Sequence, residues 1–209
     1  MTSPYADVAA DAPDDGRVEA GASAEEGAEM VRSNLTEMSA RARRGRLDDA
    51  EVLALADIPS GSTEYRPSRA LLLAQYEATG DSTAHCEMAE EVVGARENRA
   101  DPQFNLELGK CLLRRGSFKD ALEVARVAEQ NAQDIPSRIR TDRQLKIWEV
   151  QAKAYKGLYQ STEDLDYIDN SIVVWKRYLT MAKNTYRQRE ADQAGDEIRA
   201  LTDLARGAL

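Results

Sequence analysis

The chain has 209 residues, of which 42% are hydrophobic, 31% charged and 6% aromatic, and its formal net charge is −9. This composition is too apolar for a wholly disordered chain and excludes collagen-like and disulfide-scaffold proteins. Eight of the acids lie in residues 1–29 with Arg17 as the only base there, so the rest is nearly neutral and lacks the surplus of Lys and Arg that strong nucleic-acid binding needs.

The first 29 residues have the composition of an acidic tail. They consist mainly of Ala, Asp, Glu and Gly, interrupted by Pro4 and Pro13. Ordering such a segment would cost backbone entropy and bury very little apolar surface in return. We therefore predict a disordered tail over residues 1–29, followed by a helical repeat domain over 30–181 and a capping helix over 182–209.

Glycines mark regular breaks in the helical pattern that follows. Gly45, Gly80 and Gly116 stand in matching contexts at intervals of 35 and 36 residues, and each separates two helical stretches. Glycine closes helices readily because it adopts the left-handed conformation without steric cost. The intervals predict helical hairpins, each of which needs a neighbouring hairpin to cover its apolar face.

The clearest unit, residues 102–135, resembles a tetratricopeptide repeat (TPR), whose period is about 34 residues. The matching positions are Leu108, Gly109, Leu112, Gly116, Phe118, Ala121 and Ala128. This resemblance implies an all-α, TPR-like solenoid of about four hairpins, with Gly109 at a helix crossing. Asp101 and Pro102 supply a helix start in front of the unit.

The other units fit less closely. The unit at 67–100 is one residue short before Gly80, so its register is open by one position. The fourth unit, which begins near Trp148, has a connection several residues longer than the family's. Either its helices are longer or an insertion projects there, and the N-cap candidates at 161–164 favour longer helices. An apolar periodicity through Ile198 and Leu201 predicts the amphipathic capping helix.

Few residues offer chemistry. Cys86 and Cys111 lie in helical apolar patterns outside any CxxC pair, which predicts buried thiols in a reducing compartment. The single histidine, His85, is expected to be exposed or partly packed, and we do not expect it to share a metal ion with Cys86, because neighbouring helical positions point about 100° apart. No phosphate-binding loop or nucleophile motif is present, so the prediction is a protein that is not an enzyme and has no metal or cofactor.

The TPR resemblance also implies a peptide-binding groove lined by the first helix of each hairpin. Carried onto this chain, it places these side chains in the groove: Arg43, Leu71, Leu106, Lys110, Leu113, Arg114, Lys146, Lys153 and Lys156. Basic residues dominate this set, which predicts a positive face on a nearly neutral fold. An ordinary solvated helix surface is the alternative explanation of the same charges.

The expected function is that of a non-catalytic adaptor that binds a peptide or helix, one with acidic character, of another protein. Self-assembly into a larger complex and a secretion-type chaperone role are the alternatives. No apolar run is long enough to span a bilayer and no secretory signal is visible, so we expect no membrane span and a cytoplasmic location. For the acidic tail two roles stay open: transient competition for the basic groove, or service only as a solubilising extension.

Overall fold

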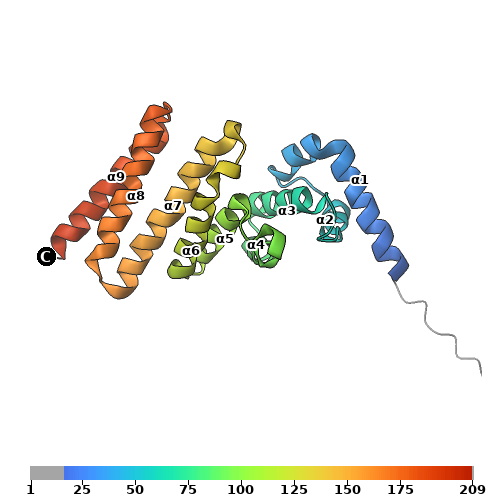
Figure 1. The fold of residues 1–209 in the computed structure, drawn as a ribbon, viewed down its shortest axis with the longest axis horizontal. Helices are drawn as coiled ribbons and strands as arrows, with labels where there is room; N and C mark the ends of the chain where they lie inside the picture. The colour runs from blue at the N-terminus through green and yellow to red at the C-terminus, as the bar shows by residue number, and fades with distance from the viewer. Residues whose placement is uncertain (1–16, 209) are drawn as a thin grey trace, which may run out of the picture.

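The computed structural model describes residues 17–208, with side chains from residue 24 onward. This part of the chain is helical and contains no strand, which confirms the predicted all-α class (Figure 1). Two short 3-10 turns, Arg96–Asn98 and Ala132–Asp134, separate some of the α-helices. The α-helices are α1 (Arg17–Ala42), α2 (Asp49–Ala56), α3 (Tyr65–Thr79), α4 (Ser82–Gly94), α5 (Pro102–Arg114), α6 (Phe118–Gln130), α7 (Ser137–Thr162), α8 (Leu165–Asn184) and α9 (Gln188–Gly207).

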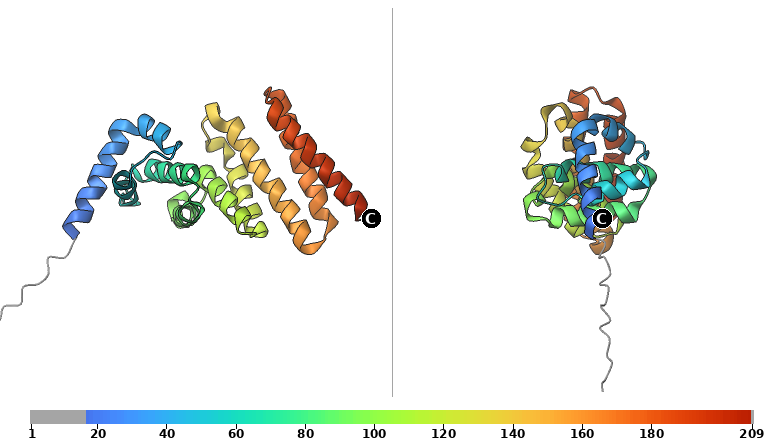
Figure 2. Two further views of the ribbon diagram at one scale, coloured as in Figure 1. Left: turned by 180° about the vertical axis from the view of Figure 1, so that it is seen from behind. Right: turned by 90° about the vertical axis from the view of Figure 1, so that its right-hand side faces the viewer.

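The helices form an elongated row in chain order, with α1 at one end and α9 at the other (Figures 1 and 2). Each helix packs against the next, and α1 also contacts α3 while α5 contacts α7. The core is accordingly divided along the row into successive apolar clusters, one spanning α1 to α5 and another spanning α7 to α9. Each amphipathic helix thus covers its apolar face with its neighbours in sequence.

The turns follow local sequence signals. Gly45, Gly80 and Gly116 have φ values of 64°, 76° and 75°, which confirms that each closes a helix in the left-handed conformation. Asp101 accepts hydrogen bonds from the amides of Gln103 and Phe104 at the start of α5, where Pro102 occupies the first turn as expected. These local features define the hairpins before any tertiary packing is considered.

The long connection of the fourth unit is absorbed into longer helices. Helix α7 has 26 residues and α8 has 20, and only Glu163 and Asp164 separate them. Asp164 accepts a hydrogen bond from the Asp166 amide and caps α8, as the N-cap candidates indicated. Glu163 and Tyr186 take positive φ values of 59° and 57° in the α7–α8 and α8–α9 turns, neither of which contains glycine. These turns are therefore invisible to a search for glycine.

The predicted disorder of residues 1–29 is not confirmed, because residues 17–29 are helical and residues 1–16 lie outside the described part of the chain. Helix α1 begins at Arg17 and has one non-helical residue, Asn34. Gly27 is buried against α2, where an added Cβ would lie 2.1 Å from the Ala54 carbonyl oxygen. Small residues that look like a disordered composition therefore allow two helices to approach closely.

The corrected N-terminal segment changes two further expectations. The proposed boundary between tail and repeat domain falls inside α1, and the boundary at 181/182 falls inside α8. Residues 17–29 belong to α1, which packs on α2, and competition of the acidic segment for the groove stays a prediction. At the other end, α9 is present, with Leu201 buried against α8 and Leu204 40% exposed.

Replacing Gly27 with Ala should destabilise the protein by about 1–3 kcal/mol, because the new methyl group would overlap a backbone oxygen that cannot rotate away. Gly94→Ala is the matched control, since a Cβ there meets no atom within 4 Å and Ala favours a helix. Urea unfolding of both variants measures the difference. Equal stability of the two variants would show that α1 does not pack on α2 through Gly27.

Candidate functional site

The first helices of three successive hairpins line a groove. Two adjoining pockets, with volumes of about 320 and 440 Å³, lie between α3, α5 and α7 and share Glu77 and Lys146. We define the groove by the residues that line them: Arg43, Ala70, Leu73, Ala74, Glu77, Gln103, Glu107, Lys110, Leu113, Arg114, Ile139, Asp142, Arg143, Lys146, Glu149, Val150 and Lys153. The surface thus combines side chains from helices that are far apart in sequence.

The structure brings six of the nine predicted groove residues to this surface: Arg43, Lys110, Leu113, Arg114, Lys146 and Lys153. Leu71 and Leu106 are 3% and 0% exposed, so their expected position on the groove surface is wrong and they belong to the core. Lys156 lies elsewhere, because its Nζ is 3.1 Å from Glu197 Oε2 on α9. A peptide-binding role for the remaining six stays a prediction.

Carboxylates neutralise most of the positive charge of the groove. Lys110 Nζ lies 2.7 Å from Glu107 and 3.0 Å from Glu77. Lys153 pairs with Glu149 in the same way, at 2.5 Å. The groove therefore has mixed charge, with six basic and four acidic side chains in its lining, so its basic surplus is smaller than we expected. Glu77 and Glu107 occupy positions of α3 and α5 that the TPR groove pattern does not mark, which is why the pattern missed them.

Glu107 lies at the centre of this charge network. Its side chain is 7% exposed, and it accepts hydrogen bonds from Lys110 Nζ at 2.7 Å and from Arg143 Nη1 at 3.4 Å. His85 Nε2 lies 3.4 Å from Glu107 Oε2 and faces no other polar partner. Burial raises the pKa of Glu107, but His85 and the two cations outweigh this effect and lower the pKa to about 2.

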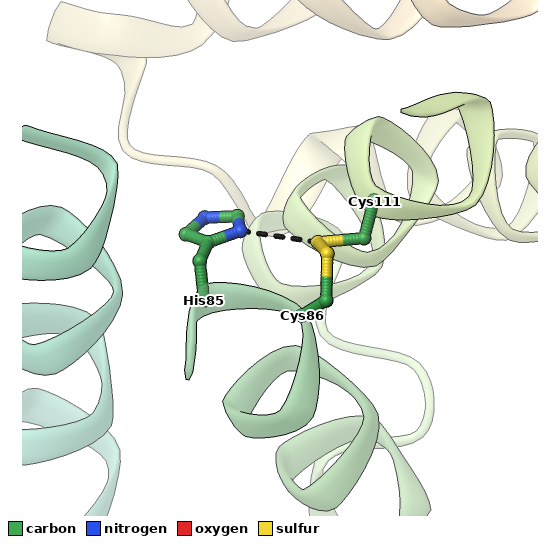
Figure 3. Close-up of side chains that lie close together, drawn as sticks. All are labelled: His85, Cys86 and Cys111. Carbon is green, nitrogen blue, oxygen red and sulfur yellow. Dashed lines mark hydrogen bonds between the residues drawn. A yellow bond between two sulfur atoms is a disulfide. The ribbon is translucent and has the colours of Figure 1, made fainter. Parts of the chain in front are cut away.

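His85 also belongs to a second polar cluster, which it forms with Cys86 and Cys111 (Figure 3). Cys86 of α4 and Cys111 of α5 form a disulfide, with their Cα atoms 5.4 Å apart. His85 Nδ1 lies 3.1 Å from Cys111 Sγ, and His85 is 1% exposed. The expectations of free thiols and of an exposed or partly packed histidine are both wrong. The cysteine argument for a reducing compartment, and so for a cytoplasmic location, no longer holds.

Arg114 closes this cluster on the groove side. Its Nη2 donates to His85 Nδ1 at 2.9 Å and lies 3.0 Å from Cys111 Sγ. The Nδ1 atom therefore accepts a hydrogen bond, which places the imidazole proton on Nε2, the atom that faces Glu107. Sequence reasoning could not find this contact, because it connects residues 29 positions apart through a long, exposed side chain.

The same atoms bear on metal binding. Ligand atoms of His85, Cys86 and Cys111 all lie within 4.8 Å of one another, so the expectation that His85 and Cys86 cannot converge is wrong. Cys111 of α5 supplies the third of these ligand atoms. The cysteines are joined to each other, however, and the Arg114 guanidinium carries a positive charge into the space between the ligand atoms. This electrostatic environment favours an anionic sulfur over a bound cation.

Comparison of the chain with protein-family models, with curated proteins and with solved structures found no match. The TPR resemblance thus rests on the residues themselves. None of the helices in the described part of the chain combines the length and the hydropathy that crossing a bilayer requires.

Glu107→Gln should remove a contribution to stability that depends on pH. The native pKa of about 2 lies below the ordinary value of 4.5, so the contribution is present above pH 4.5 and is lost as pH falls toward 2. At pH 7 the shift corresponds to roughly 3 kcal/mol. Urea unfolding from pH 7 to pH 2 should show the wild type and the variant converging in acid.

Glu123→Gln is the control for this measurement, because Glu123 is exposed on α6. It should follow the wild-type stability at every pH. A constant difference between wild type and Glu107→Gln across the whole pH range would mean that the carboxylate of Glu107 has no native ionic partners.

Proposed function

We propose that the chain is a TPR-like stack of four helical hairpins closed by α9. The supporting features are glycine turns 35 and 36 residues apart, helices that pack in chain order, and first helices that share one groove. Lengthening of α7 and α8 departs from the family's repeat length. It leaves the alternation of first and second helices intact.

The function that this arrangement supports best is that of a non-catalytic adaptor that holds a peptide or helical segment of another protein. The observation that carries the proposal is the groove itself, which draws side chains from α3, α5 and α7 and combines apolar positions such as Leu113 and Val150 with charged ones. A bound segment would contact several hairpins at once. Because packed helices hold the groove side chains in place before binding, little conformational entropy would be lost when the segment binds.

The charge pattern refines the expected partner. Acids and bases alternate along the groove, and Glu77 and Asp142 lie beside Lys110 and Lys146. A uniformly acidic peptide would face repulsion from these carboxylates, whereas a segment with charges of both signs could pair with both. We therefore favour a partner segment of mixed charge over the acidic one predicted from sequence.

Selection from a random peptide library against the full chain tests the proposal. Lys146→Glu reverses the charge of the basic residue that lines both pockets. It should weaken binding of the selected peptides by about tenfold or more, which is the scale of one lost ionic hydrogen bond. Fluorescence polarisation with labelled peptides gives the affinities.

Lys119→Glu makes the same change in net charge on α6, where Lys119 is exposed and does not line the groove. It should change affinity by less than about twofold. If both variants weaken peptide binding equally, the loss of affinity comes from the change in net charge and not from the groove. Peptides that bind at full strength to Lys146→Glu would place the binding surface elsewhere, and an affinity that depends on protein concentration would point to self-assembly.

A further inference from the structure

We propose that Cys86 and Cys111 form a redox-active pair, which low-molecular-weight thiols reduce reversibly and in which reduced Cys111 is held as a thiolate. The site consists of the two sulfurs and His85, which Figure 3 shows, together with Arg114. It is separate from the proposed binding of a partner segment and does not depend on it.

The first observation is the position of Arg114. Its guanidinium lies 3.0 Å from Cys111 Sγ and 3.5 Å from Cys86 Sγ. Within the described part of the chain, no carboxylate lies within ion-pair distance of Arg114, although acids are abundant along the same groove. An arginine directed at two sulfurs instead of at a carboxylate supplies the positive charge that a thiolate would need.

The second observation is the state of His85. Because Nδ1 accepts from Arg114 and lies 3.1 Å from Cys111 Sγ, it presents a lone pair beside the sulfur. On reduction this lone pair gives up the Arg114 hydrogen bond and takes the proton of Cys111, and the resulting imidazolium would face the Glu107 carboxylate at 3.4 Å. The two ring nitrogens of His85 on α4 therefore face two groups of α5, the Cys111 sulfur and the Glu107 carboxylate.

The remaining charges near the cluster do not cancel this effect. Glu107 is shared with Lys110 of the same helix and with Arg143 of α7, and Lys110 also pairs with Glu77 of α3. The carboxylates facing the cluster are therefore already matched by cations of their own. Arg114 remains as the charge in contact with the sulfurs.

A stabilised thiolate makes the disulfide easier to reduce, because the reduced state is favoured and because Cys111 becomes the better leaving group. In the first step, the thiolate of an external thiol bonds to Cys86 Sγ, the bond between the cysteines breaks, and its electron pair remains on Cys111. A second external thiolate then bonds to the first external sulfur and releases Cys86, which takes up a proton. Overall, two external thiols become one disulfide, and the protein bridge becomes a thiol at Cys86 and a thiolate at Cys111, with the remaining proton on His85 Nδ1.

Both sulfurs are buried, with Cys86 3% and Cys111 0% exposed. Exchange therefore requires local opening, and its rate reports on that opening. The equilibrium between bridge and thiols depends instead on how strongly the reduced state is stabilised. The equilibrium position is accordingly the quantity to measure.

The experiment equilibrates the full chain with mixtures of reduced and oxidised glutathione at pH 7, then counts free cysteines by alkylation and gel shift. Arg114→Met keeps much of the aliphatic stem and removes the charge, and it should move the equilibrium toward the bridge by about tenfold or more. Arg115→Met is the control, because Arg115 pairs with Glu90 and carries the same charge. It should shift the equilibrium by less than about twofold.

A second measurement covers the case in which Arg114→Met fails to fold. In Cys86→Ser the remaining thiol is Cys111, and the ultraviolet absorbance of its thiolate at pH 7 should indicate that most of it is ionised, against a few per cent for an ordinary cysteine. A bridge that resists glutathione and responds equally to both arginine variants would overturn the proposal. So would a Cys111 that is mostly protonated in Cys86→Ser.

Discussion

The burial of one carboxylate constrains the centre of this protein. Glu107 is 6% exposed, and a buried charge is tolerated only where other groups compensate for the water it has lost. Its partners are supplied by three helices: His85 by α4, Lys110 by α5 itself and Arg143 by α7. Because Lys110 also pairs with Glu77 of α3, one acidic side chain connects three consecutive hairpins at the base of the groove.

Helix α5 meets several requirements at once because its faces differ. Gln103, Glu107, Lys110 and Arg114 follow one another at spacings of four, three and four residues, which places them along one stripe that faces the groove. Its other faces bury Phe104 and Leu106. Cys111 and Arg114 are three residues apart, so the helix also brings the disulfide and its cation together. The groove and the sulfur cluster are thus neighbouring faces of one helix.

The sequence could predict those parts of the fold that depend on local signals. Gly116 closes a helix because the backbone there needs a left-handed conformation, and Asp101 caps one because its carboxylate reaches the first free amides. Such requirements involve only a few neighbouring residues. The sequence did not predict the turns at Glu163 and Tyr186, because these residue types are not typical of the left-handed conformation. Only the packing of the surrounding helices holds them in it.

The errors arise where a residue's role depends on a distant partner. Gly27 was assigned to the acidic tail, but in the structure it packs against Ala54 of α2. Leu106 was assigned to the groove, but neighbouring helices cover it completely. Likewise, the pairing of Cys86 with Cys111 requires two helices from different hairpins to meet. Composition and periodicity describe one helix at a time, so they predict its amphipathic character but not which neighbour it contacts.

The central claim is that Glu107 joins α5 to α7 across the groove, and a double-mutant cycle with Arg143 tests it most directly. Arg143 Nη1 lies 3.4 Å from Glu107 Oε1 and is 36 positions away in sequence, so the pair reports on tertiary structure alone. Unfolding free energies of Glu107→Gln, Arg143→Met and the double variant at pH 7 should give a coupling energy of about 1 kcal/mol or more. Additivity within about 0.3–0.5 kcal/mol would contradict the claim that this carboxylate holds the two helices together.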